Sequence, residues 1–356
     1  MTSDSSLRPW TRFLLWFCGA TLLLGCVLVG LIVWANPYRN IPFASSDRPL
    51  MDVNQRYLYP AVARDPRFDS AVFGNSTIRL LRPELLNQTL GGQFAQLAMN
   101  SGTAWEEWRM ARFFLSQRAQ PRTVILGLDS LWCSQNPDDR LITERGFPEW
   151  MYDDNPWNDL LNLFNGKVIE IAGRILTRTV TGEGKVHFDQ TGYGNFLPPR
   201  TDYDLTRARE HIYGQAMPVL KAPVVPPVVL SEAERQALVF PTHALMQEFL
   251  TGSPAQTQVI LMWVPYHAVG LPATGSREEG VLETCKQRVT ALAKARPHTM
   301  VVDFMIRSDI TTRDENYWDS LHYDTAIADR VVSGLGQALR GESSAAGDYR
   351  LLDAME

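Results

Sequence analysis

The sequence predicts an α/β protein with a doubly wound, mainly parallel sheet of five strands, one N-terminal transmembrane helix and a helical insertion. Two observations predict the sheet. Short apolar runs end in glycine, proline or a small polar residue, and stretches with helical spacing lie between them. A third observation predicts the membrane helix, because a long run without charged side chains lies close to the N-terminus.

The composition limits the class of protein. The chain has 356 residues, with 34 Lys and Arg against 39 Asp and Glu, and a net charge of −5. Without a basic excess it is poorly suited to phosphate backbones, which argues against a nucleic-acid-binding protein. Six histidines and four cysteines are few ligands from which to build a structural zinc cluster. The sequence also contains no phosphate-binding glycine loop and no dinucleotide-binding motif. We therefore expect no metal and no cofactor.

Residues 13–35 form the predicted anchor. This run carries no charge and, at about 1.5 Å per residue, is about 34 Å long, enough to cross a hydrocarbon core of about 30 Å. Trp10, Trp16 and Trp34 lie near its ends, where interfacial aromatic residues gather. The run is longer than the core of a cleaved signal peptide, and no Ala-x-Ala pattern follows it. We interpret it as an uncleaved signal anchor.

The orientation of the anchor follows from the short tail at residues 1–12. Arginines flank the helix on both sides, so the positive-inside rule gives almost no preference for either orientation. We therefore take the default for a short N-terminal tail, which is the cytoplasm. The expected location is then a bacterial inner membrane, crossed once, with the soluble region in the periplasm after a linker at 36–68. In that oxidising compartment Cys133 and Cys285 either pair or remain buried thiols, and the sequence leaves both alternatives open.

The soluble region alternates strand-like and helix-like segments. The predicted strands are residues 70–73, 94–99, 123–126, 259–264 and 300–302, and the predicted helices are 105–118, 231–250, 280–295 and 326–340. Continuous apolar runs fit strands that are buried on both faces of a parallel sheet. Sites in such sheets collect at the carboxyl ends of the strands. We expect one domain over 69–340, with its site at those ends.

Two regions break this alternation. Residues 136–200 contain an amphipathic stretch at 160–176, which predicts separate helices with the character of a lid. Residues 216–230 have four prolines among valines, which predicts an extended connector. Together they predict an insertion at 136–230. Residues 341–356 form the C-terminal tail, and its small, polar stretch at 341–347 is expected to fray.

The strongest chemical signal joins the two ends of the soluble region. Ser76 follows the first strand, whereas Asp319 and His322 lie near the C-terminus. A serine hydroxyl becomes a useful nucleophile when a histidine takes its proton, and a carboxylate holds that histidine in the required tautomer. Asp and His three residues apart fit one short loop. We predict Ser76 as nucleophile, His322 as base and Asp319 as its partner. The alternative for Ser76 is a helix cap.

These residues carry a family resemblance. Together with Gly102 after the second strand and a Gly127-x-Asp129 segment after the third, they make the chain resemble the SGNH/GDSL hydrolase superfamily over about residues 69–339, with the insertion unmatched. The resemblance implies a three-layer sandwich. It also implies that the backbone N–H of Gly102 helps to hold an oxyanion. Asn100 either lines this pocket or satisfies backbone groups at the strand end.

The chain departs from the superfamily pattern at two positions. Asn75 stands where the usual motif has Asp, and Asp129 stands where it has an oxyanion-binding Asn. A charged Asp129 would repel a developing oxyanion, and the loss of one donor costs about 100- to 1000-fold in rate. Either Ser130 or backbone groups replace the donor, or Asp129 has a structural role, or the protein is a weak or inactive relative.

Other side chains are candidates for the edge of a site. Trp318 is adjacent to Asp319, and His267 follows the fourth strand, where it would face the cleft. Tryptophans elsewhere could stack on sugar rings, but core packing is their default role: Trp105, Trp108, Trp150, Trp157 and Trp263.

The overall organisation resembles two groups of envelope proteins. One is the membrane-anchored D-alanine transfer proteins of the teichoic acid pathway, and the other is the SGNH-like partners of membrane-bound O-acyltransferases. The resemblance implies acyl transfer or ester hydrolysis on an envelope polysaccharide or lipid, with a membrane-bound O-acyltransferase as a possible partner. The alternative is a catalytically inactive SGNH-like scaffold that assists an integral-membrane acyltransferase or a polymer-export complex.

Overall fold

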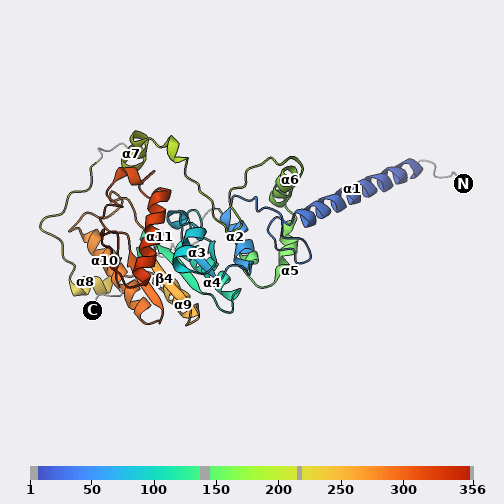
Figure 1. Ribbon diagram of the computed structural model, residues 1–356. Helices are drawn as coiled ribbons and strands as arrows, with labels where there is room; N and C mark the ends of the chain where they lie inside the picture. Colours follow the sequence, from blue (N-terminus) through green and yellow to red (C-terminus); the bar gives the residue numbers. More distant parts are fainter. Residues whose placement is uncertain (1–6, 137–144, 215–218, 353–356) are drawn as a thin grey trace. The chain divides into compact units, whose positions relative to one another are not determined.

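The computed structural model (Figure 1) describes residues 7–136, 145–214 and 219–352, and they form two compact units. The anchor unit comprises Met1–Val53 and Asp153–His187, and the sheet unit comprises Asn54–Tyr152 and Phe188–Glu356. The predicted insertion at 136–230 is therefore divided between them. Its segments 137–144 and 215–218 lie outside the described residues, as do the ends of the predicted tails, 1–6 and 353–356.

The anchor unit is helical. Its elements are α1 (Leu7–Ala35), α5 (Pro156–Asp159), η5 (Leu160–Leu163) and α6 (Gly166–Thr181). Helix α1 is long and apolar enough to cross a membrane, and by length and composition it fits either a membrane span or a signal sequence. Its last turn contacts the rest of the unit, because Ile32 and Ala35 are buried and α1 packs against α6. Side-chain caps explain where α6 begins: Asn165 accepts from the N–H of Val168.

The sheet unit contains six strands in the order β2-β1-β3-β4-β5-β6. They are β1 (Ser70–Phe73), β2 (Phe94–Gln96), β3 (Thr123–Leu128), β4 (Gln258–Trp263), β5 (Thr299–Asp303) and β6 (Arg350–Leu351). The first five are parallel, and β6 is antiparallel to β5. The prediction of a mainly parallel α/β sheet is confirmed. The predicted count of five strands is wrong.

The missed strand lies in the C-terminal tail, just after the small polar stretch at 341–347 that was expected to fray. Arg350 donates to Asp303 at 2.6 Å, and the Tyr349 ring lies 5.3 Å from that of Phe304. Arg330 donates to both carboxylate oxygens of Asp348, at 2.5 and 2.6 Å. All these partners are distant in sequence, so the local composition of small polar residues could not predict them.

Helices of the sheet unit fall into two contacting sets. Helix α3 (Pro83–Leu90) contacts α11 (Thr325–Leu339), whereas α9 (His243–Gly252) contacts both α4 (Ala104–Ser116) and α10 (Arg277–Lys294). Right-handed crossovers between parallel strands in this order place the two sets on opposite faces of the sheet, as expected for a doubly wound fold.

Shorter elements complete the unit. They are α2 (Gln55–Arg64), η1 (Ser76–Ile78), η2 (Ser130–Cys133), η4 (Glu149–Met151), η6 (Arg200–Asp202), α7 (Leu205–Tyr213), α8 (Glu232–Ala237) and η7 (Asp314–Asn316). The single helix predicted at 231–250 is two helices, α8 and α9. Pro241 lies between them, where its ring and missing N–H interrupt a helix.

A disulfide links two of these elements. Cys133 at the end of η2 is bonded to Cys285 on α10, across 152 residues of sequence. The sequence left this pairing open, and the structure decides it. The bond ties the loop that follows β3 to the helix that precedes β5.

Replacing both bonded cysteines by serine is expected to lower the free energy of unfolding by about 3 kcal/mol, because the bond closes a long loop in the unfolded chain. Urea unfolding of the full chain in detergent measures the loss. The matched control is Cys18→Ser with Cys26→Ser, since those two cysteines are free and exposed on α1. Equal unfolding midpoints for the two double variants would contradict the prediction.

Candidate active site

Ser76 is presented by a tight turn at the end of β1. Gly74 has φ +142, and a Cβ there would lie 2.7 Å from Ile78 Cγ2, so only glycine fits. Asn75 caps η1, because its Oδ1 accepts from the backbone N–H and the hydroxyl of Thr77 at 3.0 and 2.7 Å. The cap is therefore Asn75 and not Ser76, and the half-buried Ser76 side chain remains available for chemistry.

Asp319 and His322 lie in one short loop. The loop is closed by a hydrogen bond from the N–H of Trp318 to the carbonyl of His322 at 2.9 Å. Inside it, Asp319 Oδ1 accepts from the backbone N–H groups of Leu321 and His322 at 2.8 and 2.9 Å. These bonds fix the carboxylate at the base of the loop, so a single segment supplies both imidazole and carboxylate.

The structure brings the three predicted catalytic side chains together. His322 Nε2 lies 2.8 Å from Ser76 Oγ, and His322 Nδ1 lies 2.7 Å from Asp319 Oδ2. Burial raises the pKa of Asp319, but the hydrogen bonds from His322 and the backbone outweigh it, and the pKa is lowered overall. An ionised Asp319 favours hydrogen on Nδ1 of His322, which leaves Nε2 to accept the Ser76 hydroxyl.

Two side chains that the sequence did not single out cover this group. The ring of Phe196 meets the His322 ring edge to face, with 5.2 Å between centroids. The Arg79 guanidinium lies 4.7 Å from the centre of the Phe196 ring. Arg79 is buried and also donates to Asn100 Oδ1, so it joins the covering ring to the loop after β2. Its place three residues after Ser76 was the signal available in the sequence.

The loop after β2 holds two predicted pocket residues. Asn100 is half-buried, and its Oδ1 accepts from Arg79, which leaves its Nδ2 as a donor. The backbone N–H of Gly102 donates to the carbonyl of Met99 at 3.1 Å. The N–H expected to hold an oxyanion therefore already has an acceptor.

A buried ion pair fixes the backbone of that loop. Arg56 donates to Glu106 at 2.5 and 2.7 Å, and neither side chain is exposed. The same guanidinium donates to the carbonyls of Asn100 and Ser101 at 3.1 and 3.2 Å. Ser101 has a φ of +50, a strained conformation that these bonds help to maintain.

Asp129, at the end of β3, has a structural role. It is 3% exposed, accepts a hydrogen bond from Asn75 Nδ2, and caps η2 by accepting from the N–H of Leu131 at 2.8 Å. Burial raises its pKa to about 6, although the bonds from Leu131 and Asn75 oppose that rise. Ser130 is exposed at the start of η2 and hydrogen-bonds to Tyr266.

A second buried acid, Glu107, lies beside Asp129. Its Oε2 accepts from the indole N–H of Trp132 at 2.9 Å, and a Cβ on Gly102 would lie 3.5 Å from its Oε1. Burial raises the pKa of Glu107 well above its usual range, and the negative charge of Asp129 raises it further. The first turn of α4 and the loop after β3 therefore each bring a buried acid to the same place, a pairing that the sequence did not indicate.

Asp129 predicts a pH dependence of stability. Since the native state holds the proton of this carboxyl more tightly than the unfolded chain, its stabilising contribution is present below about pH 4 and is lost as the pH rises through about 6. Between pH 4 and 7 the wild type should lose about 3 kcal/mol relative to Asp129→Asn, which has no titrating group there. Urea unfolding of both proteins at the two pH values measures the difference. An unchanged difference would contradict the prediction.

His267 and Trp318 border the triad loop in different ways. His267 is fully buried and does not face a cleft; its Nε2 lies 3.2 Å from Asp314, and its N–H donates to the carbonyl of Ser320 at 3.1 Å. Burial lowers its pKa, against the opposing charge of Asp314. Trp318 is half-buried and packs edge to face on Tyr203 at 5.0 Å. His267 thus supports the loop from behind.

The other tryptophans divide between core and surface. Trp263 is fully buried in β4, whereas Trp157 is 60% exposed on α5. Trp105, Trp108 and Trp150 are half-buried. Among the described residues, no group of three or more His, Cys, Asp or Glu could hold a metal ion.

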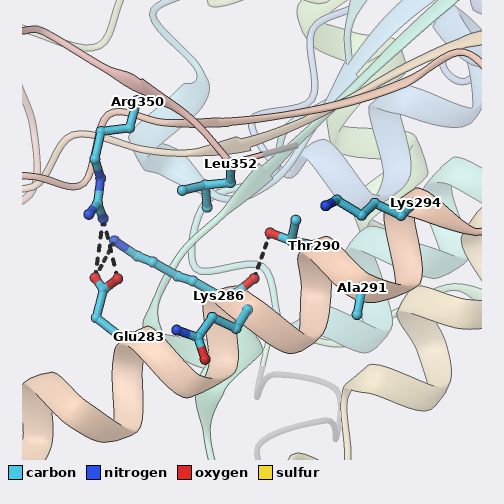
Figure 2. Close-up of a pocket in the computed structure, with 8 residues that line it drawn as sticks. Glu283, Lys286, Thr290, Ala291, Lys294, Arg350 and Leu352 are labelled. Atoms are coloured by element: carbon cyan, nitrogen blue, oxygen red, sulfur yellow. Dashed lines mark hydrogen bonds and ion pairs between the residues drawn. The ribbon is translucent and has the colours of Figure 1, made fainter. Parts of the chain in front are cut away.

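Figure 2 shows a separate cavity of about 350 Å³ beside α10 and β6. Its charged groups already satisfy one another. Lys286 donates to both oxygens of Asp303 and to the carbonyl of Met305, at 2.9 to 3.0 Å. Arg350 binds Glu283 and Asp303. This cavity offers no unpaired reactive group, so we place the candidate active site at Ser76.

Comparisons with known proteins do not identify a family for this chain. No family model and no curated protein matches it. A solved structure from Streptococcus pneumonia, described as a candidate platelet activating factor, matches with a TM-score of 0.35 and 10% identity, covering 90% of this chain and 99% of that one. A likeness at this level carries no argument about function.

Proposed function

We propose that the chain is a membrane-anchored, extracytoplasmic serine acyltransferase or esterase of the SGNH type, acting on a cell-envelope polysaccharide or lipid. One observation carries the proposal. Ser76 Oγ lies 2.8 Å from His322 Nε2, and the same imidazole lies 2.7 Å from Asp319 Oδ2. This is the arrangement that activates a serine hydroxyl for attack on an acyl group.

The reaction proceeds in two halves. Ser76 Oγ attacks the carbonyl carbon of the acyl donor while its proton passes to His322 Nε2, and Asp319 stabilises the resulting imidazolium. The tetrahedral intermediate collapses, and the leaving alkoxide takes the proton from His322. His322 then removes a proton from an incoming hydroxyl of a glycan or from water. That oxygen attacks the acyl-enzyme, and Ser76 regains its proton.

Two groups are suited to hold the oxyanion in this proposal. The N–H of Ser76 is at the start of η1, where the first N–H groups have no partner within the helix. The Nδ2 group of Asn100 is the donor end of an amide whose oxygen is occupied by Arg79. Asp129 is engaged by Asn75 and by the backbone of Leu131, which supports a structural role for its carboxylate.

The end of α1 supports a retained anchor over a cleaved signal sequence. Ile32 and Ala35 are 2% and 0% exposed, so they belong to the core of the anchor unit. Cleavage within or after α1 would remove side chains that the folded unit needs. We propose a single membrane crossing with the soluble region in the periplasm.

Covalent labelling tests the nucleophile without requiring the natural acceptor. The full chain in detergent is treated with a fluorophosphonate, and the modified peptide is identified by mass spectrometry. We expect an adduct on Ser76, and none on a His322→Ala variant, which lacks the base. Folded wild-type protein that carries no adduct on Ser76 would overturn the proposal.

The carboxylate of Asp129 supports a second candidate function, that of an inactive scaffold beside an integral-membrane acyltransferase or a polymer exporter. Buried negative charge close to the nucleophile is unfavourable to an oxyanion. Complementation of a deletion strain separates the two functions. Full rescue by Ser76→Ala supports the scaffold, whereas failure to rescue by a stably expressed Ser76→Ala protein supports the enzyme.

A further inference from the structure

Four large apolar side chains are exposed on the anchor unit. Phe43 is 64% exposed, Trp157 60%, Leu161 85% and Phe164 59%. Trp157 on α5 and Leu161 on η5 are four residues apart, and Phe164 is the residue that follows η5. The rings of Phe43 and Trp157 lie 6.3 Å apart, so Phe43 joins the same surface. We call these four residues the apolar patch.

The patch is held by buried polar contacts. Asn40 and Asp159 are almost fully buried, and Asn40 Nδ2 donates to Asp159 Oδ2 at 3.0 Å. This bond joins the segment that follows α1 to the end of α5. The exposed side chains are therefore presented by an ordered scaffold directly connected to the anchor helix, and they are not the loose end of a chain.

The length of exposed helix fixes the distance between this scaffold and the membrane. Every residue of α1 from Pro9 to Val27 is exposed, and the helix becomes buried in its own unit over the following turns, at Ile32 and Ala35. The uncharged part of the helix starts at Phe13, so a hydrocarbon core of about 30 Å at about 1.5 Å per residue ends near Ile32, where burial begins. The anchor unit thus begins where the hydrocarbon ends.

We infer that the apolar patch lies in the headgroup region of the bilayer that α1 crosses, where it seats the anchor unit on the lipid surface. The inference rests on the proposed membrane anchoring of α1. Aromatic side chains favour this interfacial region, and exposed apolar groups there are removed from water. A lipid surface explains both the composition of the patch and its place next to the emerging helix.

Depth-dependent fluorescence quenching tests the inference. The full chain carries Cys18→Ser, Cys26→Ser and Leu161→Cys, is labelled with an environment-sensitive fluorophore, and is reconstituted into phosphatidylethanolamine–phosphatidylglycerol vesicles. Leu161 is 85% exposed, so its replacement leaves the core intact. The matched control is Val239→Cys in the same background, 64% exposed on the sheet unit. Phe164→Cys provides a second labelled position on the patch.

Lipids with a spin label near the headgroup should quench the label at 161 or 164 about twofold more strongly than they quench the label at 239, and aqueous iodide should show the reverse order. Equal iodide quenching at all positions would overturn the inference. Protection from both quenchers at 161 and 164 would also overturn it, because a protein would then cover the patch.

Two separate measurements distinguish this inference from the proposals on which it depends. Release of the full chain from membranes by alkaline carbonate would refute the anchor itself. Phosphonate labelling of Ser76 reports on the catalytic proposal, whatever the patch does. Quenching by iodide in a protein that resists carbonate and labels at Ser76 would refute the patch alone.

Discussion

Ser76→Ala and His322→Ala are each expected to lower the rate of ester turnover by about 10⁴-fold or more. The first removes the attacking oxygen, and the second removes the group 2.8 Å away that takes its proton. Release of p-nitrophenol from an acetyl ester by the full chain in detergent measures the rate. The double variant should be no slower than the slower single variant, because the two residues act in the same step.

Ser333→Ala is the matched control for these variants, since Ser333 is exposed on α11. It should retain wild-type turnover. Ser76 and His322 are half-buried, and the Asp319 carboxylate keeps its two backbone N–H donors when His322 is replaced, so circular dichroism and urea unfolding should be close to wild type. A folded Ser76→Ala protein with wild-type turnover would refute the catalytic role of this serine.

Asn75→Asp is expected to lower the free energy of unfolding at pH 7 by about 4 kcal/mol. The amide of Asn75 donates to Asp129, and both side chains are buried. The substitution puts two carboxylates in contact where a donor met an acceptor, and an uncompensated buried charge costs several kcal/mol. Urea unfolding of the full chain at pH 7 measures the loss.

The exchanged pair, Asn75→Asp with Asp129→Asn, should recover most of that stability. An aspartate at 75 still accepts from Thr77, and an asparagine at 129 can donate to it while its oxygen accepts from Leu131. The double variant also has an acid at 75 and an amide at 129, as in the pattern that the sequence resembles. A loss of stability in the double variant equal to the sum of the losses in the two single variants would contradict the pairing, since directly bonded residues give a non-additive cycle.

The single variant Asp129→Asn bears on the two candidate functions, because it removes the negative charge that argues against oxyanion binding and places no other carboxylate beside Ser76. If the chain is an enzyme whose rate is limited by that charge, Asp129→Asn should raise turnover above wild type. Unchanged turnover in this variant would mean that Asp129 serves the packing of the two loops alone.

Features that depend on neighbouring residues were predictable before the structure was known. Uncharged length predicted α1, and short apolar runs predicted β1 to β5, because burial on both faces of a parallel sheet demands continuous apolar strands. Ser76 at a strand end and the short spacing of Asp319 and His322 were also local signals. Their meeting across 246 residues was implied by the family resemblance, and the structure brings the side chains together.

Features that depend on residues distant in sequence became visible only in the folded chain. The Cys133–Cys285 bond, the sixth strand, the Phe196 cover over His322 and the pairing of Asn75 with Asp129 each join segments far apart in the chain. A side chain's charge, exposure and hydrogen-bond partners depend on what surrounds it after folding. In the sequence, Asp129 is a departure from the expected motif. In the folded protein it is buried against the amide of Asn75 and links two loops.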